Sequence, residues 1–208
     1  MFGLTKGEEK VLRGLSSPQK IQDFLDRLPI NFEKNGDTHM SPRRVLRQGK
    51  AHCVEGALVA AAALWLGGER PLLLDLKTNF LDDEHVVALF RQNGCWGAIS
   101  KTNHAVVRYR DPIYETVREL AMTYYHEYFR DDDGLKTLLS FSRPFDLRLL
   151  GDYWLTTEED LWEIDDRLNE LLHYKFVPQK NQPLIRRATP FERQVLNTRE
   201  WAKDNPRT

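Results

Sequence analysis

Apolar side chains recur at helical spacing in the first quarter of the chain and then fill one segment completely. Residues 18–28 show a helical pattern between two prolines, and residues 42–49 form a shorter helix that opens with Ser-Pro and ends at glycine. From residue 51 to residue 66 nearly every position is apolar, so no amphipathic stripe is left. Because a helix that is apolar all round is enclosed by protein, we predict a buried central helix here.

After the Gly-Gly pair that closes this helix, the pattern changes to short segments typical of strands. We predict strands over residues 71–77, 85–91 and 95–102, and a fourth over residues 105–109. The second and third are joined across Asn93-Gly94, and Asn-Gly is the strongest short signal for a hairpin. The sequence therefore indicates a small antiparallel sheet.

Helical spacing returns over residues 112–128 and 156–174, the second of which begins with a capping-box sequence. The tail is polar, contains proline and has mixed charge, as partly disordered arms do. We predict an α+β fold with N-terminal helices, the buried central helix, a small antiparallel sheet and extra C-terminal helices. Its parts are a core over 1–110, a C-terminal helical part over 111–178 packed on the core, and an arm over 179–208.

The charge of the chain is nearly balanced. Its 208 residues hold 30 Lys and Arg against 31 Asp and Glu, a net charge of −1. This balance provides no field for a polyanion, and no known nucleic-acid-binding pattern is present, so nucleic acid is not an expected partner. The charged residues 1–15 leave no room for a secretory signal, and the longest apolar run is shorter than the roughly 20 residues that span a bilayer. We predict a cytoplasmic protein of one main domain without a membrane partner.

Cys53 lies at the start of the predicted central helix. A thiol in the first helical turn is at the positive end of the peptide dipoles, which favour the thiolate and lower the pKa of the thiol. Glu55 opposes this effect unless its side chain points away. A thiolate nucleophile also needs a base, and His85 opens the first strand of the hairpin. The second cysteine, Cys95, lies beside the hairpin turn and is expected to be a structural thiol.

The predicted hairpin register places a hydroxyl near His85. With a two-residue Asn-Gly turn, His85 pairs with Thr102, and the alternation of side chains puts His85 and Ser100 on the same face. Ser100 is then diagonal to His85 and within reach of its imidazole.

Three stretches of the chain, "GKAHCVEGALVAAAAL", "EHVVALF" and "CWGAISKT", resemble the transglutaminase-like superfamily, whose fold is shared with papain-like cysteine proteases. The resemblance covers residues 41–102. It implies that Cys53 is the nucleophile and His85 the base of acyl transfer or of amide or peptide hydrolysis. It implies a peptide, amide or protein substrate and no cofactor.

The third member of the triad departs from this family. The family places an aspartate four positions after the tryptophan, where this chain has Ser100. A hydroxyl fixes the tautomer of an imidazole but does not stabilise an imidazolium as a carboxylate does. Asn103 is the alternative orienting residue, as in papain-like enzymes, if the strand bulges near its end. Asp82 and Asp83 are further candidates by proximity in sequence.

Three residues are predicted to contact the substrate: Gln48, His52 and Trp96. An upstream glutamine supplies an oxyanion donor in papain-like proteases, and Gln48 stands in a loosely similar place. His52 adjoins the nucleophile, and Trp96 is core or substrate wall. The histidines and cysteines match no spacing of metal ligands on a helix or knuckle, so no metal site is expected.

A second interpretation has a different class of function. Without the aspartate, the same fold is a catalytically inactive scaffold that acts as a protein-interaction module. A reactive Cys53 at neutral pH favours the enzyme, and an ordinary or buried thiol favours the scaffold.

Overall fold

The computed structural model describes residues 2–202 as an α+β structure, in which helices enclose one antiparallel sheet. Its α-helices are α1 (Lys6–Gly14), α2 (Pro18–Arg27), α3 (Pro42–Gln48), α4 (Cys53–Leu66), α5 (Val117–Tyr125), α6 (Trp162–Asn169) and α7 (Pro190–Arg193). Its strands are β1 (Leu72–Thr78), β2 (His85–Gln92), β3 (Cys95–Ile99), β4 (Arg110–Tyr114), β5 (Leu138–Ser142), β6 (Phe145–Asp146) and β7 (His173–Lys175). Four 3₁₀ helices complete the described elements: η1 (Leu147–Leu150), η2 (Tyr153–Leu155), η3 (Gln179–Leu184) and η4 (Gln194–Asn197).

The strands lie in the order β4-β3-β2-β1-β5-β7, and β6 also pairs with β1. The hairpin of β2 and β3 has the predicted register, since Gln92 pairs with Cys95 and Ala88 with Ile99. Its turn residues Asn93 and Gly94 both have positive φ angles, 49° and 86°, as an Asn-Gly hairpin turn requires. The predicted register is confirmed, but β3 ends at Ile99 and not at residue 102, so the predicted pair of His85 with Thr102 is not formed and His85 pairs with Leu76 of β1.

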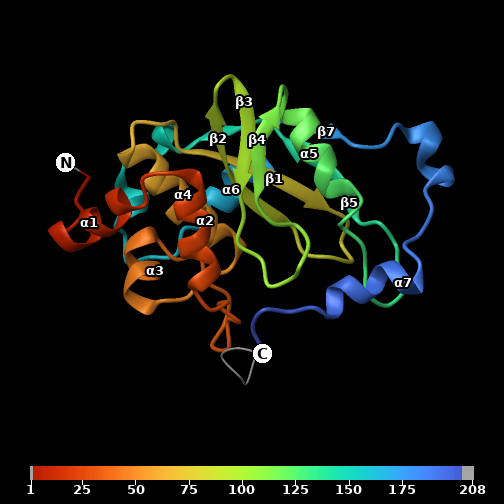
Figure 1. Ribbon diagram of the computed structural model, residues 1–208, viewed down its shortest axis with the longest axis horizontal. Coiled ribbons are helices and arrows are strands. Elements are labelled where there is room, and N and C mark those ends of the chain that lie inside the picture. Colours follow the sequence, from red (N-terminus) through yellow and green to blue (C-terminus); the bar gives the residue numbers. More distant parts are fainter. Residues whose placement is uncertain (1, 203–208) are drawn as a thin grey trace.

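Helix α4 is the buried central helix and packs on one face of the sheet, mainly against β2. Helices α1, α2 and α3 pack against α4 (Figure 1), and α2 also contacts β3 of the sheet. Gly56 lets α4 approach the end of β3, because a Cβ at this position would lie 2.4 Å from the Cβ of Lys101. The Lys101 ammonium donates to the carbonyl oxygens of Leu25 and Leu28 at the end of α2. Lys101 therefore joins α2, α4 and the end of β3.

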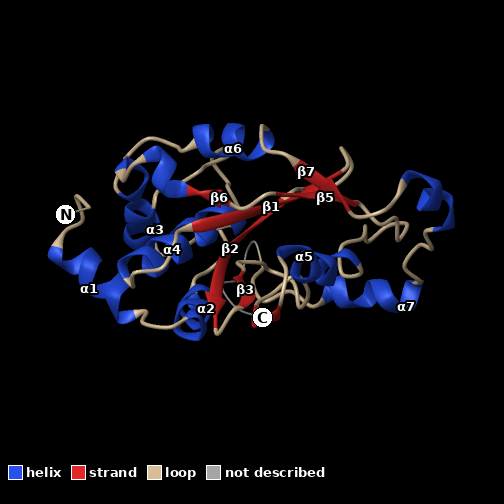
Figure 2. Ribbon diagram, turned by 90° about the horizontal axis from the view of Figure 1, so that it is seen from above, coloured by secondary structure: helices blue, strands red, loops and turns tan. Residues whose placement is uncertain are grey.

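The opposite face of the sheet is covered by α5, which lies across β1 from α6 in Figure 2. Leu74, Val87 and Leu89 point from the strands toward Leu120 and Tyr124 of α5, and all five side chains are buried. Side chains of β1 and β2 therefore alternate between two apolar cores, one around α4 and one around α5.

The helix expected over residues 112–128 is shorter than predicted. Residues 110–114 form strand β4 at the sheet edge, where Pro112 is tolerated because no partner needs its missing N–H. Helix α5 then begins after Thr116, whose hydroxyl accepts from the backbone N–H of Glu119 while the Glu119 carboxylate accepts from the N–H of Thr116. This reciprocal cap sets the start of the helix.

The helix expected over residues 156–174 is also wrong at both ends, because tertiary contacts hold its first turn in a loop. The carbonyl of Thr157 accepts from Ser41, and the carboxylate of Asp160 accepts from the backbone of His39 and the guanidinium of Arg44. Residues 162–169 form α6, and residues 173–175 form strand β7 beside β5. The sheet thus includes strands from the predicted core over residues 1–110 and also from residues 111–178, which were expected to be helical.

The C-terminal arm is packed on the rest of the chain up to residue 202, the last that the structure describes. Trp201 is buried, and the arm carries η3, α7 and η4. The fourth strand expected over residues 105–109 is instead a loop, against which the arm lies. Within residues 2–202, none of the helices has the length and apolar character needed to cross a bilayer.

Candidate active site

Cys53 is the first residue of α4 and is delivered there by a short, tightly held turn. Helix α3 ends at Gly49, whose φ of 68° is left-handed and favours glycine. The N–H of Ala51 donates to the carbonyl of Pro29 at 3.1 Å, and the carbonyl of Ala51 accepts from Asn31 at 3.1 Å. Because both sides of Ala51 are paired, the chain reverses into α4 with Cys53 in a defined place, partly exposed.

Glu55 is fully buried two residues after the cysteine, and its carboxylate is the centre of a network of donors. It accepts from the hydroxyl of Thr38 at 2.8 Å, from the backbone N–H of Met40 at 3.1 Å and from that of His52 at 2.9 Å. The amide of Asn31 donates to both of its oxygens, at 3.3 and 3.2 Å. The carboxylate therefore points away from the thiol and holds the loop over residues 31–40 against α4.

His52 lies between this network and the thiol. Its Nε2 donates to the carbonyl oxygen of Thr38 at 2.6 Å and lies 3.4 Å from a carboxylate oxygen of Glu55 and 3.6 Å from one of Glu33. Burial lowers the pKa of His52, but the hydrogen bond to Cys53, the charges of Cys53 and Glu55, and the Thr38 carbonyl raise it to about 9. His52 is therefore an imidazolium at neutral pH when the thiol is ionised.

Two imidazoles, those of His52 and His85, act on the pKa of the Cys53 thiol. Burial raises the pKa of this thiol, since a charge is poorly solvated there. Burial is outweighed by the interactions of the sulfur with the imidazoles of His52 and His85, which hold the pKa of Cys53 well below its usual value. The thiolate is thus more favoured than in an ordinary cysteine.

His85 opens strand β2 and is oriented by Ser100, as the register predicted. The Ser100 hydroxyl donates to the carbonyl oxygen of Val107 at 2.6 Å, which leaves its oxygen to accept from Nε2–H of His85 at 2.8 Å. Nδ1 of His85 is then the nitrogen left for Cys53. Gln22 of α2 fixes Ser100 from below, since its amide bonds the backbone N–H of Ser100 at 3.0 Å and the carbonyl at 2.8 Å.

Val107 adopts a strained backbone to reach Ser100. Its φ is 61°, in the left-handed region that a β-branched residue rarely enters, at a cost of about 1–3 kcal/mol. Its N–H donates to the carboxylate of Glu127 at 2.8 Å, and Arg110 pairs with the same carboxylate. The surrounding contacts thus impose the conformation that aims the Val107 carbonyl at Ser100.

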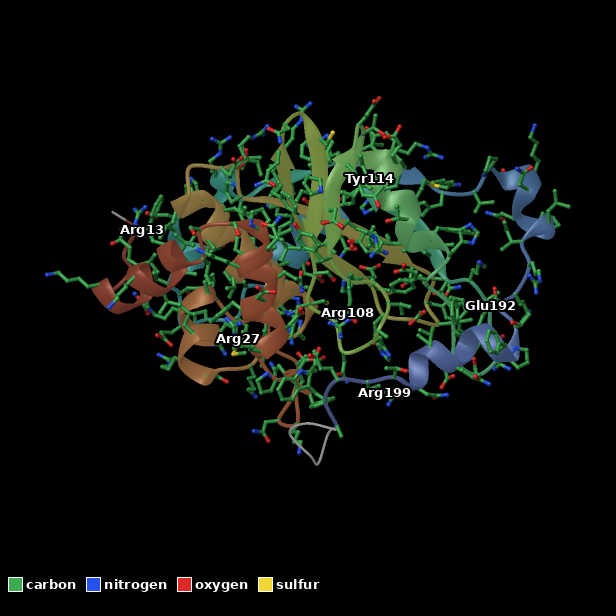
Figure 3. All side chains as sticks on the ribbon, viewed as in Figure 1. Arg13, Arg27, Arg108, Tyr114, Glu192 and Arg199 are labelled. Carbon is green, nitrogen blue, oxygen red and sulfur yellow. The ribbon has the colours of Figure 1, made fainter. Side chains whose placement is uncertain are left out.

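A cavity of about 620 Å³ opens over Cys53, His52 and His85, a size that suits a small ligand or a few residues of a peptide. Loops from four parts of the chain form its walls: residues 82–84, 101–107 and 127–132, with Leu196 and Arg199 of the arm. Figure 3 shows Arg199 below Arg108, at the place where the arm follows the loop after β3. The three chemical groups therefore face a space that a substrate can enter.

No protein-family model matches this chain. No curated protein matches it either. The resemblance to the transglutaminase-like superfamily therefore stays a prediction, and the geometry of the residues carries the functional argument.

Two predicted orienting groups are engaged elsewhere. The Asn103 side chain donates to the carbonyl of Trp201 at 2.9 Å and accepts from its N–H at 2.8 Å, so Asn103 binds the arm instead of His85. Asp82 lines the cavity, but its carboxylate accepts from the hydroxyl of Thr137 and the N–H of Asp83. Ser100 is the group that bonds Nε2 of His85.

Two of the predicted substrate contacts lie outside the cavity. Gln48 is exposed at the end of α3, because the left-handed turn at Gly49 directs the chain away before Cys53 is reached. Trp96 is half-buried on β3 beneath the guanidinium of Arg91, at 5.4 Å, and packs on the α5 core. His52 does line the cavity, but as a partner of the thiol.

The ion-pair role of His52 and the supporting role of Glu55 were not predicted, although the sequence holds a sign of both. His52 precedes the helix and Glu55 is its third residue, the spacing at which a side chain bonds back to the N-cap. Gln22 and Val107 left no such sign, since they act through contacts far apart in the sequence. Among residues 2–202, no three His, Cys, Asp or Glu side chains converge as metal ligands.

Proposed function

We propose that this protein is a cysteine-dependent acyltransferase or hydrolase in which Cys53 is the nucleophile. The observation that carries the proposal is a partly exposed thiol at a helix N-terminus that lines one cavity together with two imidazoles, both of which lower its pKa. This arrangement supplies both an ionised nucleophile and a proton carrier. The resemblance to the transglutaminase-like superfamily supports it.

In the proposed reaction the Cys53 sulfur attacks the carbonyl carbon of an amide or ester. The bond to the leaving amine or alcohol breaks, the leaving group takes a proton from an imidazole, and the acyl group stays on the sulfur as a thioester. Water or an amine then attacks the thioester, gives its proton to His85, and releases the acid or amide together with the thiolate. Hydrolysis is the preferred reaction, because the sequence identifies no site for an amine.

The substrate is a peptide or another amide, including one in a protein. The reaction is placed in the cytoplasm, where the thiols of Cys53 and Cys95 stay reduced.

A catalytically inactive scaffold is the second candidate, and the observation in its favour is Ser100. Nε2 of His85 bonds a neutral hydroxyl where the transglutaminase-like pattern has a carboxylate. A charge relay through His85 alone is therefore weaker than in that family. The cavity over Cys53 would then bind a segment of a partner protein without turnover.

The test uses an activated ester, p-nitrophenyl acetate, with the full chain. The enzyme proposal expects a burst of nitrophenol equal to the protein concentration and one acetyl group on Cys53 by intact mass and peptide mapping. Cys53→Ala abolishes both, whereas the matched control Cys95→Ser keeps both. Slow release without a burst, unchanged by Cys53→Ala, supports the scaffold.

A further inference from the structure

The two histidines at Cys53 have different electrical surroundings. His85 receives its orientation from the Ser100 hydroxyl, which is neutral and already donates to Val107. Nothing in this pair of bonds stabilises a positive charge on the ring as an anionic partner does. The bond to Ser100 therefore places a proton of His85 on Nε2, and Nδ1 is left for the thiol.

His52 has the carboxylates that His85 lacks. Its Nε2 is 3.4 Å from Glu55 and 3.6 Å from Glu33, and it donates to the carbonyl of Thr38 at 2.6 Å. Glu55 in turn is held by donors from two segments of the chain, so its position is defined. These donors fix the carboxylate beside the ring, where a negative charge stabilises a cation.

We infer that the acid and base duties at Cys53 are divided between two imidazoles: His52, supported by Glu55 and Glu33, is the cationic partner of the thiolate, and His85 is the neutral base. The inference rests on the proposed function. It explains how the site works with Ser100 where the transglutaminase-like family has an aspartate. The negative charge that Ser100 lacks is supplied by Glu55 at the N-terminus of α4. Glu55 acts through His52 and is a positioning residue.

The charged groups around His52 are consistent with this division. Those that face it are Glu33 and His39 from the loop before α3, and Cys53 and Glu55 from α4. The ring of His39 lies 5.5 Å from that of His52, centre to centre. Burial, followed by the charge of His52, lowers the pKa of His39, so His39 does not compete for the proton.

Each proton has a place in the resulting cycle. The thiolate attacks, and His52 as imidazolium gives its proton to the leaving group. Water then attacks the thioester and gives a proton to Nδ1 of His85, and the acid leaves with the return of the thiolate. His85 finally passes its extra proton to His52 through the sulfur that both rings contact. The net change is hydrolysis of one bond by one water.

The closing experiment measures the rate of Cys53 alkylation by iodoacetamide from pH 5 to pH 10, in a Cys95→Ser background. His52→Gln is expected to raise the apparent pKa of Cys53 by at least about one unit, which slows alkylation at low pH by about tenfold. His85→Gln is expected to leave most of the alkylation profile in place. In the p-nitrophenyl acetate assay the same variant is expected to stop deacylation, so the acetyl enzyme accumulates. The matched control is His126→Gln, which replaces an exposed histidine at the C-cap of α5. It is expected to change neither the alkylation profile nor the rate of deacylation.

The outcomes separate the inference from the proposed function. A profile that moves with His85→Gln and not with His52→Gln overturns the division of roles but keeps the enzyme. An ordinary thiol profile in the parent protein overturns the proposed function as well.

A measurement without substitution covers the case in which His52→Gln does not fold. Imidazole ¹⁵N chemical shifts of the native protein at neutral pH are expected to show His52 protonated on both nitrogens and His85 on Nε2 alone. A doubly protonated His85 beside a neutral His52 overturns the inference.

Discussion

Two buried carboxylates of this protein each contact a histidine, yet only one pair belongs to a site. At the start of α4, Glu55 lies beside His52, which also contacts a thiol and a cavity. In the sheet, Asp75 of β1 accepts from Nε2 of His173 at 2.9 Å, and Nδ1 of the same ring bonds the carbonyl of Leu171 at 2.7 Å. Both nitrogens of His173 are thus engaged within the fold.

The two pairs differ in the third group that each histidine contacts, which is a thiol facing a cavity for His52 and a backbone carbonyl for His173. Asp75 has few donors, and burial raises its pKa despite the bond from His173. Glu55, by contrast, has donors on both of its oxygens. The pair of Asp75 and His173 joins strands β1 and β7, and the pair of Glu55 and His52 lies beside the thiol of Cys53.

The largest expected effect belongs to Glu55→Gln. The new amide group faces donors from Asn31, Thr38 and the backbone, so buried donors lose their acceptor, at a cost of about 3 kcal/mol in the free energy of unfolding. Urea denaturation measures this cost, and iodoacetamide alkylation is expected to show a raised pKa of Cys53. An unchanged stability and profile would remove the distinction between the two pairs.

Ser100→Asp tests whether a carboxylate can be moved to the strand side of the thiol. Ser100 is buried, and its oxygen lies 2.6 Å from the carbonyl oxygen of Val107, to which a carboxylate cannot donate. We expect a loss of about 2 kcal/mol, since a buried charge then faces a carbonyl oxygen. Ser100→Ala is the control. Greater stability and faster acetyl turnover in Ser100→Asp would show that His85 can take the cationic role.

Asp75→Asn is expected to lower the free energy of unfolding by about 1 kcal/mol. The loss is smaller than for the first two variants because the amide oxygen still accepts from His173. The pKa of Asp75 is raised in the folded protein, so the free energy of unfolding increases as the pH falls through that raised pKa. The variant lacks this increase, because an asparagine does not titrate. Thermal unfolding between pH 4 and pH 7 measures the difference. Alkylation of Cys53 stays as in the parent, and a changed alkylation rate would link the two pairs.

Glu33→Gln is expected to have the smallest effect. Glu33 is partly exposed, and the amide oxygen of the variant can still accept from the N–H of Thr38, so stability falls by about 0.5 kcal/mol. The apparent pKa of Cys53 rises by a few tenths of a unit, because His52 loses one of its two carboxylates. A shift as large as that of Glu55→Gln would make Glu33 the main support of His52.

The sequence by itself determined the local features of the site. Period-two alternation and an Asn-Gly turn depend on neighbouring residues, so they predict the register that brings Ser100 to His85. The uniformly apolar composition of α4 predicts its burial and the position of Cys53 at its N-terminus. These features are decided over a few residues, where backbone geometry leaves few choices.

Only the tertiary structure decided which groups surround the thiol. The loop over residues 31–40 has no periodicity, yet it supplies the donors that hold Glu55. Residues 173 and 174 were predicted to be helical but belong to strand β7. The sequence pattern missed this strand because its partner β5 is more than thirty residues away. Asn103 was expected to orient His85 from the resemblance to papain-like enzymes, but its side chain binds the arm. Contacts between distant segments depend on how the whole chain packs, and local pattern does not encode them.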